Sequence, residues 1–246
     1  MASRWVRTVG VASVVMASAS CGTSGDRQLT VFVASSLIDV FAEIEAAFEA
    51  RHPGIDVVVS SSASSSLAAQ IEAGAPVDVY ASADQLTMQS VLASRSIEGP
   101  VEIFARNRLA IAVEAGNPHG VTGLRDLLSD DLVVVLAAPE VPAGAYAGRV
   151  LEGAGLILEP ASFEQSVRAV ATKVALGEAD AGIVYHTDIE ASDGRLAEVV
   201  VPDDQNVVVE YPIVVVDDGP DARAFVEAVL GSDGRSALAA AGFELP

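Results

Sequence analysis

Hydroxyl groups at the expected starts of helices are the side chains of this sequence best suited to chemistry with a ligand. Six serines occupy seven positions in residues 60–66, and Ser35 and Ser36 stand at a similar junction. A third junction, residues 140–148, carries Pro142 where the first turn of a helix is expected. Serine hydroxyls and the free N–H groups of a helix N-terminus both donate hydrogen bonds, so these junctions could hold an anion.

Helix capping is the simpler interpretation of any single serine in these junctions. An N-cap serine accepts a hydrogen bond from the first turn of its own helix, and serine is among the preferred residues there. Capping needs one serine per helix, whereas residues 60–66 supply six. The surplus hydroxyls favour a contact with a ligand.

Motifs of catalysis and of metal binding are missing from the sequence. His52, His119 and His186 lie far apart and have no metal-ligand spacing, so an ordinary loop position is expected for each. The sequence contains no G-x-S-x-G, Walker A, G-x-G-x-x-G or H-E-x-x-H motif. The many carboxylates belong to no motif and are expected on solvated faces. We therefore expect a binding protein rather than an enzyme, with no cofactor.

Composition limits the partners that the protein could have. The 246 residues carry a formal net charge of −20 and contain one lysine, Lys173. Nucleic acids and anionic membranes require a basic surface, so neither is expected as a partner. The chain is 51% hydrophobic but only 5% aromatic, which predicts an aliphatic core in one large domain or two smaller ones.

Residues 1–28 have the pattern of an export signal followed by a polar tether. Arg4 and Arg7 precede an apolar stretch that is too short to span a bilayer. Cys21, the only cysteine, follows this stretch and resembles the lipidated residue of a bacterial lipobox, although Ser18 stands where leucine is usual. We expect an extracytoplasmic protein that is either lipid-anchored at the cell membrane through Cys21 or free in the periplasm.

Hydrophobic periodicity predicts strands that alternate with helices, and hence an α/β fold with parallel or mixed sheets flanked by helices. The expected strands cover residues 29–35, 55–60, 77–82, 108–116, 132–139, 181–185, 198–202 and 207–218. The expected helices cover residues 36–52, 67–74, 84–94, 123–129, 143–153, 163–176 and 221–243. Two of the strands could connect two lobes, of which lobe I would comprise residues 29–108 and 208–246 and lobe II residues 109–207.

Several segments, in matching order and spacing, resemble the bacterial molybdate-binding proteins of ABC importers, the ModA family. They read LTVFVASSLIDVF, SSSASSSLAAQIEAGAPVDVYASADQ, VPAGAYA and GIVYHTD. The resemblance implies a two-lobed periplasmic-binding-protein fold of type II, with the ligand in the cleft between the lobes. It also implies a monomer that captures molybdate or tungstate and delivers it to a membrane permease. The alternative is a receptor of the same fold for another oxyanion, such as sulfate, or for a small organic anion.

The resemblance further implies which groups would hold the oxyanion. In that family neutral donors contact its oxygens, and no side chain ligates the metal directly. The matching positions are the hydroxyls of Ser36, Ser64 and Tyr185 and the backbone N–H groups of Ala143 and Val167. A site made only of donors disfavours protonated phosphate, because the phosphate hydroxyl would face another donor.

Three neighbouring side chains bear on this assignment. Ser35 and Ser65 adjoin the two matched serines and blur which hydroxyl makes each contact. Arg168 follows Val167 and could be imagined as an anion clamp, but the resemblance makes it a nearby structural residue.

Overall fold

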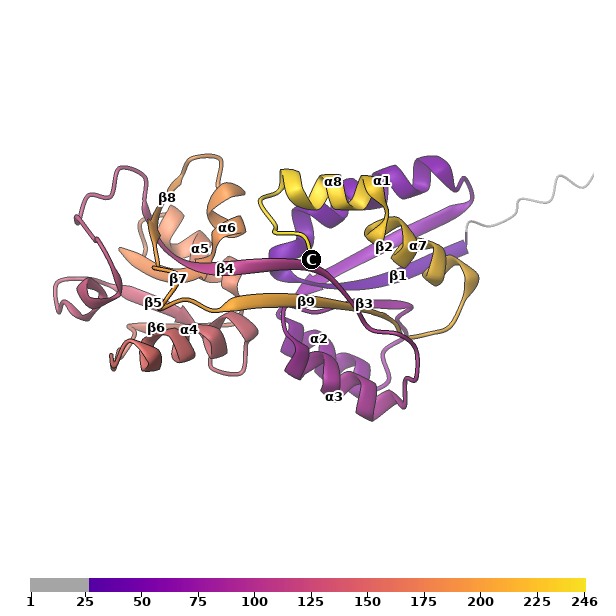
Figure 1. Cartoon of the computed structure of the whole chain (residues 1–246), viewed down its shortest axis with the longest axis horizontal. Coiled ribbons are helices and arrows are strands. Elements are labelled where there is room, and N and C mark those ends of the chain that lie inside the picture. Colours follow the sequence, from indigo (N-terminus) through magenta and orange to yellow (C-terminus); the bar gives the residue numbers. More distant parts are fainter. Residues whose placement is uncertain (1–26) are drawn as a thin grey trace, which may run out of the picture.

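The predicted alternation of strands and helices is present in the computed structural model, which describes residues 27–246 (Figure 1). The predicted signal segment and Cys21 therefore lie outside the described residues. The strands are β1 (Arg27–Ala34), β2 (Ile55–Ser62), β3 (Val79–Ala81), β4 (Glu102–Glu114), β5 (Val134–Ala137), β6 (Ser162–Glu164), β7 (Ala181–Tyr185), β8 (Leu196–Val200) and β9 (Val208–Val215). The helices are α1 (Ile38–Arg51), α2 (Ser64–Glu72), α3 (Gln85–Arg95), α4 (Pro142–Gly153), α5 (Val167–Ala175), α6 (His186–Glu190), α7 (Pro220–Leu230) and α8 (Ser232–Ala240), with 3-10 turns η1 (Ser35–Leu37) and η2 (Leu124–Leu128).

The strands form a mixed sheet whose middle is the pair β4 and β9. The strand order is β2-β1-β3-β9-β4-β7-β5-β6, and β8 pairs with β4. Strand β1 is parallel to β2 and β3, and β5 is parallel to β6 and β7, while β4 and β9 are antiparallel to each other. Figure 1 shows β4 and β9 running side by side through the molecule, with the two sets of parallel strands and their helices at opposite ends.

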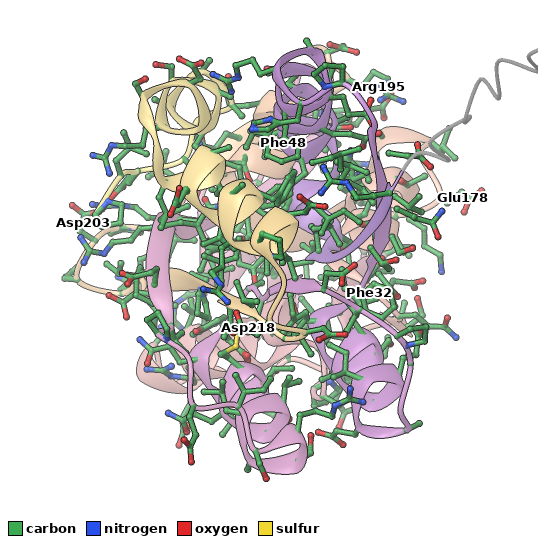
Figure 2. The ribbon with its side chains drawn as sticks, turned by 90° about the vertical axis from the view of Figure 1, so that its right-hand side faces the viewer. Phe32, Phe48, Glu178, Arg195, Asp203 and Asp218 are labelled. Atoms are coloured by element: carbon green, nitrogen blue, oxygen red, sulfur yellow. The ribbon has the colours of Figure 1, made fainter. Side chains whose placement is uncertain are left out.

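Helix packing follows the apolar stripes of the sequence. On α1 the buried residues Val40, Phe41, Ile44 and Phe48 recur at helical spacing and face the core. The rings of Phe48 and Phe225 pack edge to face at 5.2 Å, which joins α1 to α7. Figure 2 shows Phe48 between the ribbons, with the acidic side chains of Glu178 and Asp203 at the rim.

Two predicted helices differ from the structure. The helix expected over residues 163–176 begins only at Val167, because Ser162–Glu164 form the short strand β6 and Ser166 caps the helix. The last helix, expected over residues 221–243, is broken at Gly231 into α7 and α8. The backbone of Gly231 is extended, with a ψ of 178°, which no helical residue adopts.

Other boundaries move without changing the order of the elements. Strand β2 extends through Ser62 and α2 begins at Ser64, so the serine run is shared between a strand and a helix instead of forming a loop. Strand β4 begins at Glu102 and is longer than expected. The five-residue helix α6, too short for a periodic signal, was missed.

Candidate anion-binding site

The candidate residues lie at the carboxyl ends of parallel strands, where open α/β sheets bind their ligands. Turn η1 follows β1 directly, and α2 follows β2 after one residue, Ala63. Helices α4 and α5 follow β5 and β6, and Tyr185 is the last residue of β7. The sheet thus brings five junctions together that are up to about 150 residues apart in sequence.

One small pocket contains all five residues that were predicted to contact the anion. It encloses about 10 Å³, or about 190 Å³ when the adjoining space open to solvent is counted. No lining residue has a charged side chain. The pocket is lined by Ala34, Ser35, Ser36, Ala63, Ser64, Ala83, Val141, Pro142, Ala143, Val167 and Tyr185. The structure thus places the predicted residues together, while their contact with a ligand stays a prediction.

Ser64 is held so that its hydroxyl hydrogen remains available to the pocket. Its side chain is 1% exposed, and its Oγ accepts a hydrogen bond from the N–H of Ala83 at 3.0 Å. Its carbonyl accepts a second bond, from the hydroxyl of Tyr80 at 2.9 Å. Because the backbone N–H can only donate, Ser64 Oγ acts as an acceptor toward Ala83, and its own hydrogen is free to be donated to a ligand.

Ser36 has a similar arrangement on the neighbouring junction. Its Oγ lies 3.1 Å from the hydroxyl of Tyr211, a fully buried residue of β9. Tyr211 is in turn 3.4 Å from the side-chain nitrogen of Asn107 on β4. Ser36 is thus held by Tyr211, which does not line the pocket, whereas Ser64 is held by Ala83, which does.

Tyr185 brings a hydroxyl group that has no hydrogen-bond partner within the described part of the chain. The residue is 1% exposed, and its ring packs edge to face on Tyr211 at 5.9 Å. Burial, the largest cause, raises the pKa of the Tyr185 phenol well above its usual range, so the group stays protonated. A buried donor without a partner is costly, which points to a ligand as its missing acceptor.

Two helix N-termini complete the pocket wall. In α5 the Ser166 hydroxyl accepts a bond from the N–H of Ala169 at 3.2 Å, and the N–H of Val167 belongs to the unpaired first turn. In α4 the first residue, Pro142, has no N–H group, so the N–H of Ala143, the second residue, is the first donor of that helix. Both helices thus direct unpaired N–H groups and the positive ends of their dipoles at the pocket.

Arg168 does not line this pocket. Its guanidinium pairs with the carboxylate of Asp39 on α1, and both line a separate, larger hollow. Asp188 also borders that hollow, and its Oδ2 accepts a bond from the backbone N–H of Tyr185 at 3.1 Å. Burial raises the pKa of Asp188 to about 7, while the Tyr185 N–H and Arg168 act in the opposite direction.

The serine run divides into several roles. Ser60, Ser61 and Ser62 complete strand β2, and Ser64 enters the pocket. Ser65 lines a different surface hollow, and Ser66 is exposed, which separates both from the candidate site. At the other junction Ser35 lines the pocket beside Ser36.

Sequence reasoning missed the groups that support the pocket from behind, chiefly Asn107, Tyr211 and Thr187. All three are buried, and the side-chain amide of Asn107 reaches the other two. Asparagine is uncommon inside strands, so Asn107 within β4 was a weak signal. Tyr211 looked like an ordinary core aromatic residue, and nothing in its local sequence shows that its hydroxyl reaches a residue 175 positions away.

Together these groups form an uncharged cluster of hydrogen-bond donors. Three hydroxyls and two backbone N–H groups suit a small, fully deprotonated oxyanion. Within residues 27–246, no cluster of three or more His, Cys, Asp or Glu side chains is placed to hold a metal ion. The same part of the chain has no helix with the length and hydrophobicity needed to cross a bilayer.

Comparison with known proteins gives consistent matches over most of the chain. Residues 29–244 match the family described as bacterial extracellular solute-binding protein. The molybdate-binding protein ModA of Mycobacterium tuberculosis is 38% identical over 227 residues, which cover 91% of this chain and 87% of that protein.

Solved structures share the fold. The periplasmic molybdate-binding protein of Azotobacter vinelandii is 22% identical, with a TM-score of 0.76, and the match covers 89% of this chain and 99% of that one. The sulfate-binding protein SubI from Mycobacterium tuberculosis is 20% identical, with a TM-score of 0.78, over 89% of this chain and 87% of that one. The mixed sheet and its flanking helices are thus those of periplasmic binding proteins, and by sequence the chain belongs to the bacterial extracellular solute-binding proteins and, within them, to the ModA family.

Proposed function

We propose that this protein captures molybdate, and also tungstate, outside the cytoplasm and delivers it to the permease of an ABC importer. The relative from Mycobacterium tuberculosis is named for molybdate binding, and 38% identity over most of both chains supports the same ligand here. Ser36, Ser64 and Tyr185 would donate through their hydroxyls, and Ala143 and Val167 through their N–H groups.

The observation that carries this proposal is the Tyr185 hydroxyl, which is buried and has no partner among the described residues, on a side chain that lines an uncharged pocket. Hydrogen bonds to a charged group contribute about 1.5–3 kcal/mol each. Five of them therefore supply roughly 7–15 kcal/mol before the costs of ordering the ligand and the protein. A micromolar dissociation constant needs about 8 kcal/mol, which neutral donors can supply at the upper end of this range despite the net charge of −20.

Sulfate is the second candidate ligand. It is also a fully deprotonated tetrahedral dianion, and the sulfate-binding protein SubI has the same fold. Bond lengths in sulfate are shorter than in molybdate, so the size of the closed pocket would decide between the two.

Calorimetric titration of the mature protein with molybdate, tungstate, sulfate and phosphate tests the proposal. We expect micromolar or tighter binding of molybdate and tungstate and a weak or undetectable response to the other two anions. Tight sulfate binding without molybdate binding would replace the proposal with the second candidate.

We further propose that the pocket lies in a cleft between two lobes, residues 29–108 with 208–246 and residues 109–207. The pocket is lined from both sets of strands, and β4 and β9 are the elements that join them. Domain closure around the anion would then bring the serines of one lobe toward Tyr185 of the other. Small-angle X-ray scattering should show a smaller radius of gyration with molybdate than without it.

Membrane attachment through a lipid on Cys21 is a separate proposal, and it goes with a monomeric receptor that meets the permease at the membrane surface. The Cys21→Ser variant is expected to leave the membrane fraction of expressing cells. An unchanged membrane fraction would indicate that the segment before residue 28 is not a lipidation signal.

A further inference from the structure

A chain of buried hydrogen bonds runs behind the pocket from Asn107 to Ser36. The Asn107 Nδ2 donates to Thr187 Oγ1 at 2.8 Å and to the Tyr211 hydroxyl at 3.4 Å. The Tyr211 hydroxyl lies 3.1 Å from Ser36 Oγ. Asn107, Thr187 and Tyr211 are at most 4% exposed, and none of them lines the pocket.

Asn107 determines which atom donates in each of these hydrogen bonds. The Asn107 Oδ1 accepts the backbone N–H of Arg108 at 2.9 Å, which orients the amide with its NH₂ group toward Tyr211 and Thr187. An amide nitrogen can only donate, so the Tyr211 oxygen accepts on that side. The single hydrogen of the Tyr211 hydroxyl is then left for Ser36 Oγ. Burial, the largest cause, raises the pKa of Tyr211, so this hydrogen stays in place.

The consequence for the pocket is that Ser36 is an acceptor toward Tyr211 and a donor toward the ligand. If Ser36 donated to Tyr211 instead, the Tyr211 hydrogen would face the Asn107 NH₂ group, and two donors would meet in a buried place. The N–H of Ala83 likewise makes Ser64 Oγ an acceptor within the protein and leaves its hydrogen for the ligand. The second hydrogen of the Asn107 amide holds Thr187, two residues after Tyr185, so one side chain supports both sides of the pocket.

We infer that Asn107 and Tyr211 are positioning residues that fix Ser36 as a hydrogen-bond donor and thereby select oxyanions without a proton over protonated ones. The inference rests on the proposed function, since it concerns the selectivity of the same pocket. Molybdate offers acceptors only, whereas hydrogen phosphate carries a hydroxyl that needs an acceptor in the site.

The test compares molybdate with inorganic phosphate at about pH 8, where the main form of phosphate is a dianion that keeps one proton. In Asn107→Asp an oxygen replaces the donating nitrogen at nearly constant shape, so the Tyr211 hydrogen can turn away from Ser36. The added negative charge weakens both dianions alike. The ratio of their affinities therefore reports the direction of the hydrogen-bond chain rather than the charge.

Tyr211→Phe is the second variant. It interrupts the hydrogen bonds between Asn107 and Ser36 without adding charge, and it keeps the ring that packs on Tyr185. Tyr80→Phe is its matched control. It also removes a buried tyrosine hydroxyl, but one that donates to the carbonyl of Ser64 and does not touch Ser36.

We expect the molybdate-to-phosphate affinity ratio, measured by calorimetry, to fall at least about tenfold in Asn107→Asp and about threefold or more in Tyr211→Phe, and to stay unchanged in Tyr80→Phe. If circular dichroism shows that Asn107→Asp does not fold, the affinity ratio of Tyr211→Phe alone tests the inference. A ratio equal to that of the wild type, or phosphate binding that stays undetectable in the folded variants, would overturn the inference. Failure of the wild-type protein to bind molybdate would instead overturn the proposed function.

Discussion

The hydroxyl group of Tyr185 can be tested by removing one atom. Tyr185→Phe keeps the buried ring and removes only a donor that has no partner among residues 27–246. We expect molybdate affinity to fall about 10- to 100-fold, while the melting temperature of the ligand-free protein stays equal or rises. Calorimetry and thermal unfolding measure the two effects. A clear loss of stability in the absence of ligand would show that the hydroxyl has a structural role.

Ser64 can be compared with a serine from the same run. Ser64→Ala should weaken molybdate binding by at least about 1 kcal/mol, because it removes the donor whose oxygen is held by the Ala83 N–H. Ser66→Ala is the control, since Ser66 is exposed and does not line the pocket. Equal affinities for the two variants would mean that the wrong hydroxyl has been assigned.

The first turn of α4 lies very close to the end of β5. A substitution in this turn therefore tests the position of the helix rather than the loss of a single hydrogen-bond donor. A Cβ atom at Gly144 would overlap the carbonyl oxygens of Ala137 and Ala138, and the helix start with the N–H of Ala143 must then move. We expect Gly144→Ala to lower both molybdate affinity and stability. Gly148→Ala on the same helix meets no atom within 4 Å and should stabilise the protein by about 0.5–1 kcal/mol. Similar behaviour of the two variants would contradict this placement of α4.

The N-terminus of α6 should make stability depend on pH through Asp188. Its pKa is raised to about 7 in the folded protein, chiefly by burial, above the usual value for an aspartate. The folded state then holds a proton that the unfolded state releases, so the free energy of unfolding falls as pH rises toward about 7. Chemical denaturation across this range should show a steeper fall for the wild type than for Asp188→Asn, which keeps an acceptor for the Tyr185 N–H. Parallel curves would contradict the raised pKa.

The elements that could be predicted from the sequence are those with a local signal. The stripe of Val40, Phe41 and Ile44 located α1, and the resemblance in short segments located the pocket residues. The break at Gly231 had a local signal, because Gly231, Ser232 and Asp233 interrupt the apolar pattern between α7 and α8, and the prediction of one helix over residues 221–243 passed over it. The support from Asn107 and Tyr211 depends on contacts between distant strands, which no local pattern encodes.

At the scale of the whole molecule, the net charge of −20 opposes the approach of a dianion. Salt screens this repulsion over about 8–10 Å, whereas the short contacts in the pocket are little affected. We expect the association rate of molybdate to rise with ionic strength and the dissociation rate to stay nearly constant. Stopped-flow tyrosine fluorescence measures both rates. A falling association rate would contradict this expectation and indicate that the positive ends of the α4 and α5 dipoles outweigh the net charge during the approach of the anion.

The position of the bound anion tests the central claim most directly. Crystals of the mature protein grown with molybdate can be measured on both sides of the molybdenum absorption edge, and the anomalous difference map locates the metal. We predict one peak within hydrogen-bonding reach, through its oxygens, of the Ser36, Ser64 and Tyr185 hydroxyls and the first turns of α4 and α5. A peak elsewhere, or a clear map of this pocket without molybdenum, would contradict the account.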